Sequence, residues 1–397
     1  MEAGTIGAAD MTVEMKRRQF LQLGAVGTAA ALVLPATRGF AADTRTNFSL
    51  VIKPATASMI DGTEVYVLVY CLDGLTAQPE LRVTEGDPIT ISVTNNDVTP
   101  HGFAIPGIPD ATIAMVEAGS TGTVKFAAPG GGSYLYVDPY KAPLNRVLGL
   151  HGAFIVEPSD GKTPAGSPTP FSRLEQTPQI EAFFDALGGG RARFPGEKWN
   201  PDKPEREKLW LFSQTDPKLN ARIRAGEAVN PDSVVANFLP RYFTINGLSG
   251  FDASHIHVDH SHGSSSAARI IPTGKQGEPC LIRTMNAGLA THSVHLHGNH
   301  CMTCSESDES GANFRETHVY ERDTWLLAPL ARIDVILPFE RPSDIPRGKG
   351  RWPPREEDFP LKYVMHCHTE MSQTAGGGNY PQGATTHWAM TDAITGD

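Results

Sequence analysis

The sequence lacks an excess of positive charge, and this absence excludes one class of partner. Lysine and arginine number 34 against 44 aspartates and glutamates, which gives a formal net charge of −10. Recognition of phosphate backbones requires a basic surface. We therefore expect no nucleic-acid partner.

The chain also lacks the short motifs of several enzyme classes. We find no glycine-rich phosphate loop, no Ser/His/Asp constellation and no signature of paired catalytic carboxylates. Cysteine is scarce as well, with five residues in 397. If Cys367 is a metal ligand, four cysteines remain, and these allow three disulfide pairings between which the sequence does not choose: Cys71, Cys280, Cys301 and Cys304.

The N-terminal segment has the pattern of an export signal. The run Lys16-Arg17-Arg18-Gln19-Phe20-Leu21 is a twin-arginine motif, and small residues suited to cleavage follow at Gly39-Phe40-Ala41. The apolar stretch between them, roughly residues 23–34, is too short for a membrane span, which needs about 20 residues. We predict that residues 1–41 are a Tat signal, that the protein is exported to the periplasm, and that no membrane span remains.

Removal of that segment makes the charge more negative. It takes away four of the 34 basic residues and three of the 44 acidic ones, which leaves a net charge of about −11. The oxidising compartment permits disulfides. We expect the 300–304 segment, His300-Cys301-Met302-Thr303-Cys304, to form a disulfide with another cysteine rather than to capture a metal.

The rest of the chain is typical of two β-rich domains. Short alternating strands separated by glycine, proline and aspartate turns recur between residues 42 and 158 and again between 207 and 397. Residues 159–206 are rich in proline, glycine and charge, which indicates a linker. The domains resemble a degenerate internal repeat, in which residues 89–103 correspond to 280–298, and residues 132–138 to 361–367. We predict an all-β fold of two tandem sandwiches.

Two short His-x-His runs carry the clearest chemical signal. They are His295-Leu296-His297-Gly298 and His366-Cys367-His368. In a β-strand successive side chains point to opposite faces, so the four imidazoles share one face. Cys367 points to the other face, and so does His292, which lies an odd number of residues before His295. Imidazole suits copper, zinc and iron, and a His/Cys pair is the basis of a blue-copper site. We predict two copper sites back to back, joined through the Cys367 backbone.

Histidines are unevenly distributed beyond these runs. Twelve of the fourteen lie after residue 250, and four of them fall within the segment Ser254–His262, at His255, His257, His260 and His262. Such clustering seldom serves packing. This segment is a candidate to complete a metal site, and a solvent-exposed loop that binds metal loosely is the alternative.

The histidine and cysteine motifs of the second domain resemble those of a known protein family. Thr291-His292-Ser293-Val294-His295-Leu296-His297-Gly298 is similar to the HPxHLHG motif of multicopper oxidases, and His366-Cys367-His368 is similar to their HCH motif. The segment Tyr242–Gly247 resembles the strand that opens their last cupredoxin domain. The resemblance implies two tandem cupredoxin-like Greek-key sandwiches, as in two-domain laccases and copper nitrite reductases, which are usually trimers.

The resemblance also implies ligand roles. His292 and Cys367 would bind type 1 copper, His295 would bind type 2 copper, and the type 3 ligands would be His297, His366 and His368. The catalytic residues would be His366, Cys367 and His368, which carry electrons from the type 1 copper to an oxygen-reducing cluster.

The chain departs from the family pattern in both domains. Ser372 stands where the second type 1 histidine belongs, and His387 is the candidate replacement, with Met371 or Met390 as a sulfur ligand. In the first domain the expected histidine pairs are reduced to Thr99-Pro100-His101-Gly102 and Tyr136-Val137-Asp138. At most His101 and His151 remain there as ligands, so the first-domain copper site is degenerate.

The expected function is that of an exported copper-dependent oxidoreductase. Electrons would pass from a type 1-like copper to a histidine-bound copper centre that reduces O2, and the reductant would be a small molecule or a metal ion. Alternatives are a nitrite reductase-like enzyme and a periplasmic copper-binding or copper-tolerance protein without turnover. The resemblance implies a homotrimer, in which a neighbouring subunit could supply missing ligands.

Overall fold

The computed structural model describes residues 45–73, 76–157, 159, 207–255, 269–276, 280–307, 310–311, 313–315, 321–340 and 359–392. All of these belong to one compact unit, Val33–Asp397. The predicted export signal lies outside the described residues, and so does the predicted linker apart from Ser159. In the described part of the chain, no helix has the length and apolar character needed to cross a membrane.

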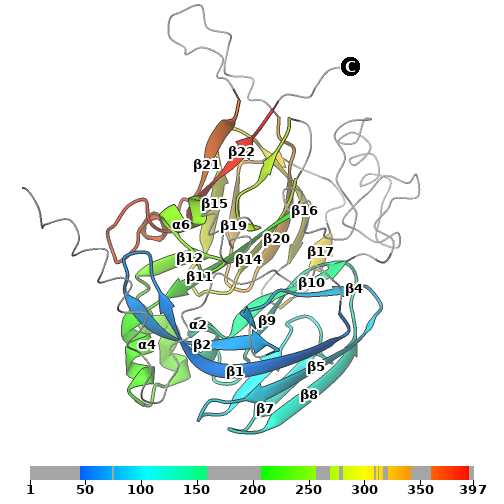
Figure 1. Cartoon of the computed structure of the whole chain (residues 1–397), viewed down its shortest axis with the longest axis vertical. Helices are drawn as coiled ribbons and strands as arrows, with labels where there is room; N and C mark the ends of the chain where they lie inside the picture. Colours follow the sequence, from blue (N-terminus) through cyan, green and yellow to red (C-terminus); the bar gives the residue numbers. More distant parts are fainter. Residues whose placement is uncertain are drawn as a thin grey trace, which may run out of the picture. The chain divides into compact units, whose positions relative to one another are not determined.

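The first half of the chain forms two five-stranded sheets (Figure 1). Sheet I has the order β3-β2-β1-β5-β8, with β1 (Asn47–Ser58), β2 (Glu64–Leu72), β3 (Thr76–Ala77), β5 (Pro88–Asn95) and β8 (Thr121–Ala127). Sheet II has the order β4-β10-β9-β6-β7, with β4 (Leu81–Thr84), β6 (His101–Ala104), β7 (Thr112–Val116), β9 (Gly132–Val137) and β10 (His151–Glu157).

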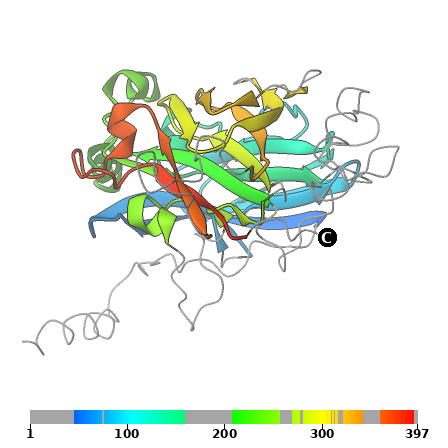
Figure 2. The same ribbon diagram turned by 90° about the horizontal axis from the view of Figure 1, so that it is seen from above.

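The second half also forms two sheets. Sheet III has the order β12-β11-β14-β20-β16-β17, with β18 paired to β16; its strands are β11 (Glu207–Thr215), β12 (Tyr242–Ile245), β14 (Cys280–Asn286), β16 (Cys301–Ser307), β17 (Asn313–Arg315), β18 (Glu321–Arg322) and β20 (Arg332–Leu337). Sheet IV has the order β13-β22-β21-β15-β19, with β13 (Thr273–Gly274), β15 (His292–Leu296), β19 (Thr324–Leu327), β21 (Leu361–Cys367) and β22 (Thr385–Met390). In Figure 2 the red β22 lies beside the orange-red β21, its antiparallel partner.

In the described residues the helical segments are short and lie in the connections between strands. They are α2 (Leu144–Val147), α4 (Pro217–Arg224), η3 (Pro231–Ser233), α5 (Val234–Asn237), α6 (Gly250–Ser254) and η5 (Glu370–Gln373). The N-cap of α4 is Asp216, whose carboxylate accepts hydrogen bonds from the backbone N–H groups of Lys218 and Leu219.

Alternating burial explains why these segments form sandwiches. In β5 the side chains of Ile89, Ile91 and Val93 are buried, while the polar residues between them face outward. Each half has its own apolar core, one containing Ile91 and Phe154 and the other containing Val294 and Trp388. The predicted all-β fold of tandem sandwiches is confirmed. The domain boundaries at 158 and 207 stay predictions.

An apolar cluster joins the two halves. Leu135 and Ile155 of sheet II pack with Leu209, Leu211 and Met285 of sheet III. Burial of such apolar surface stabilises the contact by about 25 cal/mol per Å². The two sandwiches are therefore joined by a separate apolar cluster at this contact.

A buried ionic network lies in the same region. The Arg82 guanidinium contacts Glu80, Glu157 and, at 2.8 Å, Glu207. Glu207 also accepts a 2.8 Å bond from Arg283. The network continues through Arg269, which reaches Glu80 at 2.6 Å, and through Arg283 to Asp334 at 3.3 Å; Ser133 donates to Asp334 at 2.7 Å.

Glu207 is the central anion of this network. It is buried, and the neighbouring arginines lower the pKa of its carboxyl below the usual range even though burial acts in the opposite direction. Two arginines from different halves of the chain share its charge. A buried charge that loses such a partner is strongly destabilising, because the remaining ions stay desolvated.

We therefore expect Glu207→Gln to lower the free energy of unfolding by about 3–5 kcal/mol. Chemical denaturation followed by circular dichroism measures this change. The control is Glu227→Gln, which removes an exposed ion pair with Arg222 and is expected to change stability by less than about 0.5 kcal/mol. Equal stability of the two variants would contradict the role assigned to Glu207.

Candidate metal centre

Strands β15 and β21 bring the two His-x-His runs together. They pair antiparallel, with Val294 opposite Cys367, His295 opposite His366, and Leu296 opposite Met365. Because side chains alternate along both strands, residues that are paired across them share a face. This register places Cys367 toward the core and the four imidazoles on the outer face of sheet IV, as the alternation predicts.

The inner face holds His292 and Cys367 in direct contact. The His292 Nδ1 lies 3.3 Å from the Cys367 Sγ, and the backbone N–H of Ser293 also points to this sulfur at 3.3 Å. Both side chains are fully buried. Burial lowers the pKa of His292 to about 4, so its ring is neutral at pH 7 and keeps a lone pair for a metal.

Aromatic side chains enclose this pair. The His292 ring lies 4.7 Å from the Phe212 ring and 6.4 Å from the Phe243 ring, measured between centroids. Phe212 is on β11 and Phe243 on β12, so sheet III closes the site from the other side of the sandwich. The arrangement excludes water from the sulfur.

Gln214 of β11 holds the second ring nitrogen of His292. Its Oε1 accepts hydrogen bonds from the backbone N–H groups of Leu289 and Ala290, at 2.6 and 3.0 Å. Its Nε2 is thereby directed at the His292 Nε2, 2.6 Å away. Gly288 makes room for this contact, since a Cβ there would lie 1.8 Å from the Gln214 Oε1.

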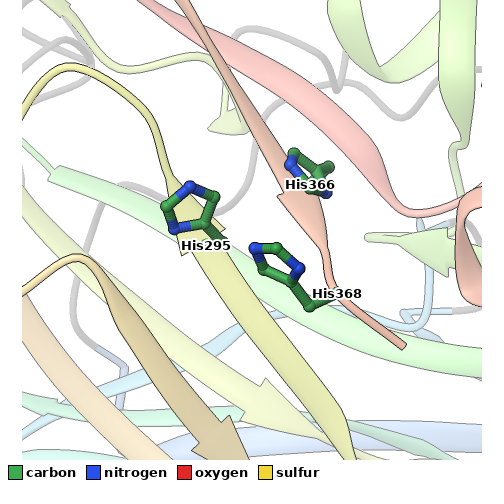
Figure 3. Close-up of side chains that lie close together, drawn as sticks. All are labelled: His295, His366 and His368. Atoms are coloured by element: carbon green, nitrogen blue, oxygen red, sulfur yellow. The ribbon is translucent and has the colours of Figure 1, made fainter. Parts of the chain in front are cut away.

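The outer face carries a group of four imidazoles, which we call the outer imidazole group: His295, His297, His366 and His368. Ring centroids are 4.6 Å apart for His295 and His297, 4.7 Å for His295 and His368, 4.9 Å for His366 and His368, 5.2 Å for His297 and His366, and 5.5 Å for His295 and His366. Figure 3 shows His295 on β15, His366 on β21 and His368 just after the end of β21, with the three rings gathered close together. One ligand atom from each of these three lies within 4.8 Å of the others.

The hydrogen bonds of this group leave nitrogen lone pairs available. The His295 Nδ1 lies 2.8 Å from the Thr324 hydroxyl oxygen and 3.1 Å from the Asp323 carbonyl oxygen, and donation to either leaves its Nε2 without a proton when the ring is neutral. The buried His366 Nδ1 has no hydrogen-bond partner, and its Nε2 lies 3.1 Å from the His297 Nε2. Burial and neighbouring imidazoles lower the pKa of His297 and of His366, which favours the neutral, ligating form.

These donor sets fit copper. Buried thiolate and imidazole suit a copper ion, and clustered imidazoles suit it as well. An orphaned buried ring nitrogen is a costly feature in a metal-free protein, because a desolvated polar atom without a partner destabilises the fold. A metal at the outer imidazole group would be held by ring nitrogens that face one another there, such as the Nε2 atoms of His297 and His366.

The structure does not bring His387 to Cys367. His387 is paired with Val364 in the β21–β22 register, three residues before the cysteine and on the outer face. Ser372 is buried, and its hydroxyl donates to the Thr369 carbonyl at 2.6 Å. Met390 is paired with Leu361, six residues from Cys367 or about 20 Å along the strand. Among the described histidines, cysteines and acidic residues, His292 is the one that contacts the Cys367 thiol.

The predicted first-domain ligands also lie away from the outer imidazole group. His101 is fully buried and bonded through both ring nitrogens to carboxylates, those of Asp138 and Asp97. His151 is buried, and its Nδ1 contacts the Arg146 carbonyl oxygen at 2.9 Å. Both rings are engaged within the first half, so this arrangement does not support the ligand role predicted for His101.

The remaining predicted features are separate from both groups. His255 stacks on Phe251 with ring centroids 3.9 Å apart. The other three histidines of its segment lie outside the described residues. His300 contacts Glu321 at 3.4 Å on the surface. All five cysteines are buried thiols, so the disulfide predicted for the 300–304 segment is wrong.

Sequence reasoning missed Gln214. It lies 78 residues from His292 in a strand without any metal-ligand motif. Only Gly288 gives a signal, because a glycine four residues before a candidate ligand indicates close approach of another group.

Comparison with known proteins agrees with this geometry. A family model described as multicopper oxidase matches residues 52–161. Putative laccase-18 of Oryza sativa subsp. indica is 25% identical over 327 residues, or 79% of this chain, and laccase-18 of subsp. japonica is 25% identical over 326 residues. The chain spans less than half the length of these relatives, 45% and 44%.

Solved structures share the fold. The blue copper oxidase from Nitrosomonas europaea aligns with a TM-score of 0.59 and 19% identity, covering 87% of this chain and 85% of that one. The multicopper oxidase mgLAC aligns with a TM-score of 0.57 and 21% identity, covering 87% and 86%. A copper-containing nitrite reductase from Thermus scotoductus SA-01 aligns with a TM-score of 0.51 and 16% identity, covering 87% and 61%.

The family-model match and the laccase relatives agree with the sandwich fold and with the thiol and imidazole donors, and they make the chain similar to multicopper oxidases, a similarity that implies copper as the cofactor.

Proposed function

We propose that the protein is an exported copper-dependent oxidoreductase that takes electrons at the His292–Cys367 position and reduces O2 at the outer imidazole group. One observation carries this proposal. Cys367 is the last residue of β21, and it lies between His366 in the same strand and His368, which follows the strand. Its thiol is on the inner face, and the two imidazoles are on the outer face. A single stretch of backbone therefore connects the two positions.

The residues around the thiol fix the sulfur and exclude water from it. Copper bound there would supply one-electron redox chemistry, which zinc does not. The His292 ring and the Ser293 N–H fix the sulfur, and Phe212 and Phe243 keep water away from it. A dry, rigid environment limits reorganisation when the charge of the site changes.

The outer imidazole group is open to solvent, whereas His292 and Cys367 are buried. His297 and His368 are exposed, and His295 and His366 are partly buried. A small oxidant such as O2 can reach this group without entering the core.

The open face also supports a proposal of homotrimer assembly, in which a neighbouring chain covers the imidazoles. The reductant would be a small molecule or a metal ion in the periplasm.

The first prediction concerns the thiol. We expect copper-loaded protein to show thiolate-to-copper absorption, and Cys367→Ser to lose this absorption together with about one copper per chain and most oxygen uptake. Absorption spectra, metal analysis and an oxygen electrode measure these quantities. The matched control is His387→Gln, which removes an imidazole from the neighbouring strand and should leave all three unchanged.

Other outcomes separate the alternatives. Copper binding without colour or oxygen uptake would favour a copper-binding protein without turnover. Nitrite consumption without oxygen uptake would favour a nitrite reductase-like enzyme. Loss of colour in His387→Gln would show that this histidine reaches the thiol, contrary to the observed register.

The second prediction concerns Gln214. When a metal takes the His292 Nδ1, the neutral ring carries its proton on Nε2, where the Gln214 amide also presents N–H groups. A carboxylate at this position would accept that proton, and such partners raise metal affinity by about 10- to 100-fold. We expect Gln214→Glu to bind copper more tightly and to have a lower reduction potential. Competition with a chelator and redox titration measure both, and weaker binding with an unchanged potential would refute the assignment.

A further inference from the structure

An arginine of the first half reaches the turn that leads to His292. Arg146 lies in α2, and its side chain is buried. Its guanidinium donates two buried hydrogen bonds, to the carbonyl oxygen of Ala287 at 2.8 Å and to that of Gly288 at 2.7 Å. Both acceptors belong to the connection between β14 and β15, in a segment that we call the 287–290 turn. A residue of the first half therefore holds a turn that closely precedes a candidate metal ligand.

The peptide group between Gly288 and Leu289 connects this arginine to Gln214. In a trans peptide the C=O and the N–H point in opposite directions. The Gly288 carbonyl accepts a hydrogen bond from Arg146. On the other side of the same peptide group, the Leu289 N–H donates to the Gln214 Oε1 at 2.6 Å. The Gln214 Nε2 lies 2.6 Å from the His292 Nε2. A continuous chain of contacts thus runs from the guanidinium to the buried imidazole.

Other polar groups of the 287–290 turn already have partners. The Gly288 N–H donates to the Asn286 Oδ1 at 2.9 Å, and the Asn286 amide donates to the Ala290 carbonyl at 2.8 Å. The Ala290 N–H donates to Gln214 at 3.0 Å. If the Arg146 side chain is removed, two carbonyls of the turn lose a buried donor. A buried polar atom that loses its partner destabilises the structure around it.

The charge of Arg146 is not balanced by a salt bridge. The buried arginines Arg82, Arg269 and Arg283 all contact carboxylates. Among the described residues, by contrast, no carboxylate forms an ion pair with Arg146, whose bonds go to neutral carbonyls. Burial lowers its pKa to about 10, so the guanidinium stays charged at pH 7. A buried charge acts over a longer distance than an exposed one, because solvent screens it less.

We propose that Arg146 is a positioning residue for the His292–Cys367 position. It holds the 287–290 turn, which directs Gln214 at His292, and its positive charge raises the reduction potential of copper bound at that position. The charge acts in this direction because oxidised copper carries one more positive charge than reduced copper and is repelled more strongly. This inference rests on the proposed function, of which copper at the His292–Cys367 position is a part.

Hydrogen exchange in the metal-free chain tests the positioning role. We expect Arg146→Met to make the amides of Leu289 and Ala290 exchange about 10-fold faster, because the turn loses two buried hydrogen bonds. The amide of Ala384, which donates to the Ser372 carbonyl at 2.7 Å, should keep its rate and reports on general unfolding. Unchanged exchange at Leu289 and Ala290 would overturn the proposal. If Arg146→Met does not fold, Arg146→Lys should show a smaller acceleration at the same two amides, because lysine can still donate to one of the carbonyls.

Redox titration of the copper-loaded protein tests the role of the charge. Arg146→Met should lower the reduction potential, whereas Arg146→Lys keeps the charge and should stay close to the unaltered protein. The control Arg222→Met removes the same charge from an exposed position and should leave the potential unchanged. An unchanged potential in Arg146→Met, or an equal decrease in both Arg146 variants, would overturn the role of the charge. Absence of thiolate-to-copper absorption in the unaltered protein would overturn the proposed function instead, and the exchange measurement would still test Arg146.

Discussion

Adjacent residues of a β-strand project from opposite faces of its sheet, and at positions 366–368 this constraint determines the whole site. It sends the Cys367 thiol into the core, where His292 and the aromatic side chains of sheet III surround it. It sends His366 and His368 outward, where β15 supplies His295 in register. The two groups have different exposure and different chemistry, although one short strand end holds both. Every other feature of the site serves to keep this strand in place.

The contact between the two halves of the chain also helps to position the side chains around His292, although the contact itself lies away from the site. Sheet III forms one side of the thiol pocket through β11 and β12, and the same sheet carries buried ions that bind the first half. Phe212 and Gln214, which contact His292, lie on the strand that Glu207 begins. Disturbance of the ionic network therefore acts on the strand that orients the buried imidazole. Stability and site geometry are linked through β11.

Features that depend on neighbouring residues could be predicted from the sequence, whereas features that depend on the pairing of distant strands could not. The faces of His292, His295, His366 and Cys367 follow from alternation, which depends only on neighbouring residues. The role suggested for His387 depended on the register between β21 and β22, which is set by the intervening loop and is not visible in the sequence. Gln214 lacked any motif. The disulfide expected for the 300–304 segment is absent, since Cys301 and Cys304 lie in β16 as buried thiols.

The internal repeat adds a physical reason for the asymmetry between the halves. His101 in the first half and His292 in the second each present Nδ1 to a residue at the end of a neighbouring strand, and that residue is Asp138 in the first half and Cys367 in the second. A thiolate is a soft metal ligand, whereas a carboxylate pairs strongly with an imidazolium. In the first half the Asp97 carboxylate accepts a hydrogen bond from the Nε2 of His101, which strengthens the ion pair. In the second half Gly288 leaves room for Gln214, which presents an uncharged amide to the Nε2 of His292. One backbone plan thus supports a metal ligand pair in one half and a buried ion pair in the other.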